Sequence, residues 1–450
     1  MVMLAGQVMW QARGGEAAAD RIRLITLDPG HFHAALFQKK MLPGISERVS
    51  VFAPLGPDLL AHLDRIMRFN TRNVNPTHWQ LEVHAGPDFW ERMLENPRGN
   101  VVVLSGNNRG KIDRIQAMVQ LGLHVLADKP WIIEPGDLPK LEEVLTAAKQ
   151  KGVVAYDAMT QRFEVSCLLA RELVHDAAVF GTPLEGTSNE PAVEMASVHY
   201  LLKQVAGVPA LRPDWFFDIR QQGEGLTDVG THLVDLVQWT LFPDQAIDYH
   251  REVQVLEGAR WPTLITMAQF KRVTGSADFP GFLAQTIRNS CLEYYANNRV
   301  HYRLRGVHVR LEVKWEFEPA AGETDTEFAL FRGTLSRLEV RQGKEEKFRP
   351  EIYIIPNHTA DRAEVLSALQ RKVANLRTAY PGLACEDQAN RIRVVIPDRF
   401  RVGHEAHFAL LTRRFLTYID HPDLLPSWEA PNMLAKYYVT TKGIELARKQ

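Results

Sequence analysis

Between residues 21 and 157, short strand-like runs rich in Val, Ile and Leu alternate with amphipathic helical runs. The strand-like runs cover residues 22–27, 49–53, 81–84, 101–105, 124–127 and 153–156. Strands that are separated by helices need crossover connections, and such connections build a parallel sheet. We therefore predict an α/β fold that begins with a doubly wound, Rossmann-like dinucleotide-binding domain. Flavodoxin-like folds share the same rhythm and remain the alternative.

The first strand-to-helix turn is where a dinucleotide-binding domain carries its glycine-rich loop, G-x-G-x-x-G. Here residues 28–33 read D-P-G-H-F-H, so Gly30 alone remains and His33 takes the third glycine position. The helix that begins near Phe32 still offers free N–H groups to a pyrophosphate. The second strand ends without an acidic residue, so the sequence does not distinguish NAD from NADP.

Two later strands end in residues that suit a ligand site at the carboxyl edge of the sheet. The fourth strand is followed by small and polar residues, Ser105-Gly106-Asn107-Asn108. The fifth is followed by Asp128-Lys129-Pro130. Because Pro130 disfavours the α conformation at Lys129, the backbone directs this ammonium group. The alternative is a surface lysine paired with Asp128.

Residues 223–239 combine a glycine-containing loop with a helical pattern, and Thr227 is the predicted N-cap. Asp228, His232 and Asp235 stand at positions i, i+4 and i+7, so they share one face of the predicted helix. An imidazole with a carboxylate one turn away is suited to general acid/base chemistry. The alternative is an ordinary amphipathic helix whose polar face is solvated.

The rest of the chain has a different pattern, and we place a second domain at residues 158–450. Residues 161–175 read as a helix, and strict alternation of apolar and polar residues between 251 and 342 predicts a large, mostly antiparallel sheet. The tail from residue 361 is mostly helical, and we expect its last helix to pack back on the first domain. Candidate substrate contacts, or alternatively parts of a packed loop, are Gln161, Arg162, His199, Trp215, Asp218 and Glu224.

Composition excludes several classes of function. A net charge of -1 gives no global basic field for nucleic acid, and no apolar run is long enough to cross a bilayer. The three cysteines lack metal-ligand spacing, so no metal site is expected. Residues 1–20 read as a disordered or processed leader. We expect a cytoplasmic protein, or a periplasmic one if these residues are the remnant of a signal peptide.

Two stretches resemble the signature motifs of the Gfo/Idh/MocA oxidoreductases. Residues 122–130, G-L-H-V-L-A-D-K-P, are similar to the family's G-K-H-V-x-x-E-K-P, with Asp128 in place of the glutamate. Residues 223–235 resemble G-G-G-x-x-x-D-x-G-x-H-x-x-D, with Glu224 at the middle glycine. Residues 331–334 resemble the family's G-T-x-G-x-L strand pair. The opening L-D-P-G-H-F-H resembles a subgroup with a distinctive C-terminal domain.

This resemblance implies a site and a cofactor. Lys129, Asp228 and His232 are the implied catalytic residues, placed around a nicotinamide and a sugar, with Asp228 orienting His232. NAD or NADP is the implied cofactor. Its expected contacts, by resemblance and by position at the strand ends, are Gly30, His31, Phe32, His33, Ser105, Gly106, Asn107, Asn108, Asp128 and Lys129.

Three functions follow, because the family uses one fold for several tasks. The first is NAD(P)-dependent hydride transfer to or from a secondary alcohol of a sugar or glycoside, for example C3 of a hexoside. The second is redox-assisted cleavage of a glycoside through a keto-sugar, with Glu224 or His199 as the additional base. The third is a cofactor-gated sensor without turnover. We also expect a homo-oligomer that forms through the open face of the C-terminal sheet.

Overall fold

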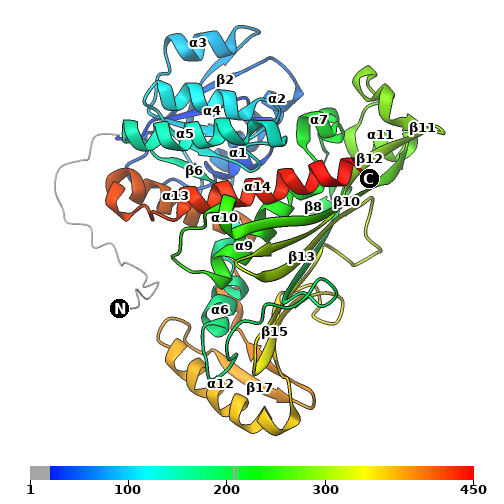
Figure 1. Cartoon of the computed structure of the whole chain (residues 1–450). Coiled ribbons are helices and arrows are strands. Elements are labelled where there is room, and N and C mark those ends of the chain that lie inside the picture. Colours follow the sequence, from blue (N-terminus) through cyan, green and yellow to red (C-terminus); the bar gives the residue numbers. More distant parts are fainter. Residues whose placement is uncertain (1–20, 206–207, 210) are drawn as a thin grey trace, which may run out of the picture.

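A computed structural model describes residues 21–205, 208–209 and 211–450 (Figure 1). The predicted leader at residues 1–20 lies outside this described part. A parallel α/β domain stands on one side of a large mixed sheet, and the last helix runs between them (Figure 1). None of the described helices has the length and apolar character that a membrane span requires.

The first sheet is fully parallel, with the order β3-β2-β1-β4-β5-β6. Its strands are β1 (Leu24–Leu27), β2 (Arg48–Ala53), β3 (Gln80–Ala85), β4 (Val101–Leu104), β5 (His124–Ala127) and β6 (Ala155–Asp157). The helices between them are α1 (His33–Leu36), α2 (Pro57–Thr71), α3 (Phe89–Glu95), α4 (Lys111–Gln120) and α5 (Leu138–Lys151). The predicted doubly wound domain is confirmed. Its strand order reverses between β1 and β4, and such a reversal opens a crevice for ligands.

The second sheet has the order β10-β12-β13-β7-β14-β15-β16-β18-β17, with β11 paired to β12. The β7–β13 pair is parallel and the other described pairs are antiparallel, so the predicted mostly antiparallel sheet is confirmed. The strands are β7 (Val193–Tyr200), β10 (Val253–Thr266), β11 (Ile287–Arg288), β12 (Cys291–Leu304), β13 (Val307–Glu316), β14 (Thr326–Arg332), β15 (Ser336–Gln342), β16 (Glu351–Pro356), β17 (Ala384–Gln388) and β18 (Arg391–Val395). A separate hairpin joins β8 (Gln204–Val205) to β9 (Val208–Pro209).

Helices cover the sheet and link it to the first domain. They are α6 (Val165–Val174), α7 (Ile219–Gln222), α8 (Gly225–Asp228), α9 (Gly230–Leu241), α10 (Tyr249–Glu252), α11 (Met267–Thr274), α12 (Arg362–Leu376), α13 (His404–Asp420) and α14 (Glu429–Arg448). α9 and α14 pack on each other, α14 also packs on β10 and β12 and α9 on β13, whereas α12 lies against β17. α13 contributes Phe408, Leu411 and Phe415 to the apolar core of the first domain.

The segment that holds the candidate acid/base residues differs from the predicted single helix. It is divided into α8 and α9, and its N-cap is Glu224 rather than Thr227. Every residue of α9 is buried, so the alternative of a solvated polar face is wrong. The segment is buried because it packs closely on the sheet. At the start of α8, a Cβ at Gly225 would collide with the Ala296 carbonyl oxygen on β12. The helix therefore lies directly on the sheet, and its polar side chains need protein partners.

Helix α14 is joined to the first domain by a buried hydrogen-bond relay. The Trp131 N–H donates to the Tyr437 hydroxyl (2.9 Å), and that hydroxyl donates to Asp157 Oδ2 (2.9 Å). Lys436 Nζ lies 2.8 Å from the same carboxylate oxygen. The relay fixes the ends of β5 and β6 against the last helix, because a buried polar group is costly when it loses its partner.

We expect Tyr437→Phe to lower the free energy of unfolding by about 1–3 kcal/mol, because it leaves the Trp131 N–H without its acceptor. The measurement is a urea titration followed by circular dichroism. The control is Tyr438→Phe, which removes a hydroxyl from the neighbouring, partly buried position. Equal midpoints for the two variants would contradict the structural role of the relay.

Candidate active site

The loops that follow β1 and β4 pack backbone against backbone at the strand-order reversal. The His31 N–H donates to the Ser105 carbonyl oxygen (3.0 Å). A Cβ at Gly106 would collide with the Asp28 carbonyl oxygen, and a Cβ at Gly30 would stand 3.1 Å from Trp215 and from Asp58. These two glycines therefore keep the floor of the crevice free of side chains.

Asp28 shows how the turn forms without its first glycine. It adopts the left-handed conformation (φ 47°), which aspartate tolerates better than most residues. Its carboxylate pairs with Arg114 (2.5 Å) on α4. The third glycine position holds His33. Its ring is buried against Asp128 and does not lie between the helix and the strand. The following helix α1 has four residues, so the helix predicted near Phe32 is short.

A charged pair bridges the two domains at the edge of the crevice. Lys129 follows β5, Asp228 ends α8, and their side chains form an ion pair in which each is about nine-tenths buried. Burial alone would raise the pKa of Asp228, but the charge of Lys129 outweighs it and lowers that pKa. The Asp228 carboxylate is thus charged at neutral pH.

His232 lies on α9 beside this pair. Burial, followed by the positive charge of Lys129, holds its pKa well below the ordinary value, so the imidazole is neutral at pH 7. Its Nδ1 is buried and has no hydrogen-bond partner within the described residues. We expected Asp228 to orient His232. Instead, the Asp228 carboxylate accepts a hydrogen bond from Lys129.

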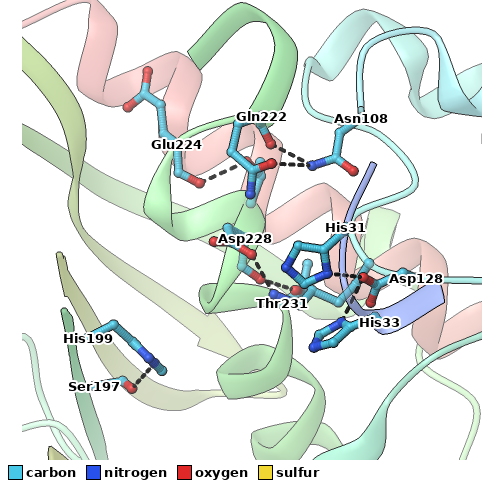
Figure 2. Close-up of polar contacts among 12 residues, drawn as sticks. His31, His33, Asn108, Asp128, Ser197, His199, Gln222, Glu224, Asp228 and Thr231 are labelled. Atoms are coloured by element: carbon cyan, nitrogen blue, oxygen red, sulfur yellow. Dashed lines mark hydrogen bonds and ion pairs between the residues drawn. The ribbon is translucent and has the colours of Figure 1, made fainter. Parts of the chain in front are cut away.

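Asp128 gathers several predicted cofactor contacts around one carboxylate oxygen (Figure 2). Its Oδ2 lies 2.8 Å from His33 Nδ1 and 3.3 Å from His31 Nδ1, and it accepts a hydrogen bond from Ser105 Oγ (3.1 Å). Lys111 donates from its buried ammonium group to the Asp128 carbonyl oxygen (3.0 Å). Burial lowers the pKa of Lys111 to about 8.

The remaining crevice residues contact the second domain. Asn107 donates to Gln221 Oε1 (2.7 Å), and Asn108 donates to the Gln222 carbonyl oxygen (2.7 Å). The Trp215 indole N–H donates to Asp58 Oδ2 (2.8 Å), so this ring lies against Gly30. The rim of the crevice is therefore built from both domains.

His199 belongs to a polar cluster on the sheet that the sequence did not reveal. Its Nδ1 lies 2.9 Å from Asp325 Oδ2, and Lys203 forms an ion pair with the same oxygen. Burial raises the pKa of the neighbouring Glu327 to about 7. Asp228 is close enough to His199 and Lys203 to influence their pKa values. The sequence marks His199 as a candidate contact, but no local signal marks Lys203, Asp325 or Glu327 as its neighbours.

Four predicted substrate contacts are engaged by other protein groups. Glu224 is fully buried and accepts hydrogen bonds from Asn298 (3.0 Å) and Arg448 (3.0 Å), which is a structural role. Glu224 is therefore not available as the additional base that the sequence suggested. Arg162 pairs with Asp235 and Glu429, Asp218 pairs with Arg220, and Gln161 donates to Glu327 (3.4 Å).

Residues 169–448 match the family model described as "Putative oxidoreductase C terminal domain". The chain belongs to this oxidoreductase family. The crystal structure of a putative oxidoreductase from Parabacteroides merdae ATCC 43184 is 43% identical, with a TM-score of 0.94 over 97% of this chain and 99% of that one. No curated protein matches the chain. The resemblance to the Gfo/Idh/MocA oxidoreductases is confirmed.

More distant solved structures share the fold. Levoglucosan dehydrogenase, solved with NADH and levoglucosan, is 15% identical with a TM-score of 0.56, covering 95% of this chain and 97% of that one. KijD10, a 3-ketoreductase from Actinomadura kijaniata solved with NADP and TDP-benzene, is 13% identical with a TM-score of 0.54. That match covers 93% of this chain and 95% of the other.

The crevice of this family member fits a dinucleotide at its floor. Within the part of the chain that the structure describes, the Phe32 and His33 N–H groups donate no hydrogen bond, so both are available to phosphate oxygens. Gly30 and Gly106 permit a close approach of the ligand to the backbone. The Lys129 ammonium group lies at the same edge of the sheet. Backbone donors beside glycines are groups that bind an anionic pyrophosphate.

Buried neutral histidines predict how stability depends on pH. Burial lowers the pKa of His31 and His62 to about 4 and that of His404 to about 3. Between those values and 6.5 the unfolded chain binds more protons at these three histidines, which outweigh the opposite contribution of Glu327, so the free energy of unfolding falls as pH falls from 7 to 5. Each histidine contributes at most about 1.4 kcal/mol per pH unit below 6.5.

Urea midpoints at pH 7, 6 and 5 measure this dependence. His62→Leu removes a ring whose two nitrogens are buried without partners in the described chain, so it should flatten the pH dependence. The control His84→Gln, at a half-exposed position, should leave the dependence unchanged. Stability that is constant or rises towards pH 5 would be inconsistent with neutral buried imidazoles.

Proposed function

We propose that this protein transfers hydride between a nicotinamide dinucleotide and a secondary alcohol of a sugar or glycoside. The observation that carries the proposal is the Lys129–Asp228 ion pair with the neutral His232 beside it, at the edge of a dinucleotide-type crevice. Levoglucosan dehydrogenase and KijD10 share the fold, and their bound NADH and NADP support the cofactor class.

The reaction needs a base, because hydride leaves a carbinol carbon only as the hydroxyl proton is removed. His232 is the proposed base, since its imidazole is neutral and can accept a proton. Lys129 stabilises the alkoxide that develops on the same oxygen. Asp228 holds the Lys129 side chain in place through their ion pair. When bound, the dinucleotide supplies the hydride acceptor or donor.

The cofactor would lie on the floor of the crevice. Gly30, Gly106 and the N–H groups of Phe32 and His33 would hold its pyrophosphate. Trp215 forms the rim, where its indole ring would flank the cofactor or the sugar. The His199–Asp325 pair would contact substrate hydroxyl groups, because imidazole and carboxylate groups offer both donors and acceptors.

Redox-assisted glycoside cleavage is a second candidate, favoured by the same His199–Asp325 pair. With Glu224 engaged in structural contacts, His199 is the remaining candidate for the base that removes a proton beside a transient ketone. Oxidation at C3 makes that proton acidic, elimination expels the aglycone, water adds to the unsaturated keto-sugar, and the returning hydride reduces the ketone. The two functions differ in products: stoichiometric NADH with an intact glycoside, or free sugar with catalytic NAD.

We expect one nicotinamide dinucleotide to bind per chain despite the altered glycine loop. Gly30 and the two free N–H groups retain the contacts that the missing glycines would have supported. Native mass spectrometry of the purified protein, with calorimetric titration of NAD and NADP, measures the binding. Absence of bound nucleotide, together with no heat from either cofactor at roughly millimolar concentration, would overturn the proposed function.

We expect His232→Ala to lower kcat/KM by roughly 10²-fold or more, because a general base is lost. Lys129→Ala should reduce kcat strongly while cofactor affinity changes modestly. The assay follows NADH and free sugar together over a panel of sugars and glycosides. The matched control is His84→Ala at the surface. A rate within about threefold of the parent for His232→Ala would refute His232 as the general base. If the parent protein binds cofactor but turns over no substrate, the result would favour the cofactor-gated sensor.

A further inference from the structure

Three side-chain groups converge on one oxygen of Asp128, and hydrogen bonding explains only two of them. His33 Nδ1 and Ser105 Oγ make hydrogen bonds to Oδ2 at 2.8 and 3.1 Å. His31 Nδ1 lies 3.3 Å from the same oxygen, yet it is buried and has no hydrogen-bond partner among the described residues. A buried ring nitrogen beside a carboxylate, without an aligned hydrogen bond, needs another partner.

The arrangement matches the ligand set of a transition metal. Zinc binds histidine nitrogen and carboxylate oxygen at about 2.0–2.2 Å in tetrahedral geometry, so its ligand atoms stand roughly 3.3 Å apart. The carboxylate oxygen lies 2.8 and 3.3 Å from the two histidine nitrogens. One ligand atom from each of the three residues falls within 4.8 Å of the others. Figure 2 shows both rings turned towards the Asp128 carboxylate.

We propose that His31, His33 and Asp128 bind a divalent transition-metal ion through two histidine nitrogens and one carboxylate oxygen. This goes beyond the proposed function and does not depend on it. Two histidines and one carboxylate leave coordination positions open, which is typical of metal sites that bind a further oxygen ligand. The ligand class for those positions is an oxygen donor: water, a sugar hydroxyl or a phosphate.

The surroundings supply the outer contacts that metal-binding histidines require. His404 Nε2, at the start of α13, lies 3.2 Å from His33 Nε2, so it can accept the N–H of the ring nitrogen that faces away from Asp128. Such a contact fixes the ring orientation and leaves the other nitrogen free for the metal. Ser105 Oγ orients the carboxylate in the same way.

The charges around the cluster are compatible with a dication. Asp128 supplies one negative charge inside the cluster. Of the two nearby cations, Lys129 is paired with Asp228, and burial lowers the pKa of Lys111 to about 8.

The experiment uses the full-length protein after treatment with a chelator. Zn²⁺ is titrated by calorimetry, and Co²⁺ is added as a spectroscopic probe, because histidine and carboxylate ligands give it characteristic visible absorption. We expect one ion per chain. His31→Gln and Asp128→Asn should each weaken binding by at least about 10-fold. The matched control, His84→Gln, changes a histidine that lies 3.1 Å from Asp88 at the surface and should leave binding unchanged.

The outcomes separate this proposal from the proposed function. Circular dichroism and urea midpoints identify any variant that fails to fold, and Asp128→Asn preserves the shape of the side chain. Absence of stoichiometric Zn²⁺ and Co²⁺ binding, or equal affinity in the parent and both folded variants, overturns the metal site. NADH fluorescence titration of the chelated protein tests the dinucleotide separately. Loss of NADH binding with intact metal binding would sink only the oxidoreductase mechanism.

Discussion

The architecture depends on a chain of buried charges that joins the two domains. Asp157, at the end of β6, pairs with Lys436 of α14, and Lys436 also lies 3.5 Å from Asp235 of α9. Arg162 binds both carboxylate oxygens of Asp235 and also pairs with Glu429. Removing one member of such a chain would leave an uncompensated buried charge, which is far more costly than losing a surface ion pair. The chain thus holds α9 and α14 in one position relative to the parallel sheet.

That constraint brings the candidate catalytic groups together. α9 carries His232 and lies on the mixed sheet, while Lys129 belongs to the parallel sheet, and the Lys129–Asp228 ion pair closes the distance between them. The site therefore exists only when both domains are docked. The same docking brings Trp215 and α7 onto the loops after β1 and β4, which makes the crevice rim a shared structure.

The altered glycine loop shows how a fold can keep its turn while its chemistry changes. Asp28 takes the left-handed conformation that glycine would supply, and Arg114 neutralises its charge. His33 fills the third glycine position and turns its ring towards Asp128. Two positions that usually serve backbone approach to a pyrophosphate now carry side chains that pair with Arg114 and with Asp128. The helix behind the loop is correspondingly short.

The sequence alone determined the parallel sheet, the antiparallel sheet and the positions of Lys129 and His232, because these follow from local periodicity and from short motifs. It could not determine which groups share a site. Asp228 stands one helical turn before His232, yet it pairs with Lys129, 99 positions away; Glu224 is bonded to Arg448, 224 positions away. The convergence of His31, His33 and Asp128 likewise needed the β1 and β5 loops to meet. Partners of buried charges are chosen by tertiary packing, since each charge must be neutralised by whatever the fold places beside it.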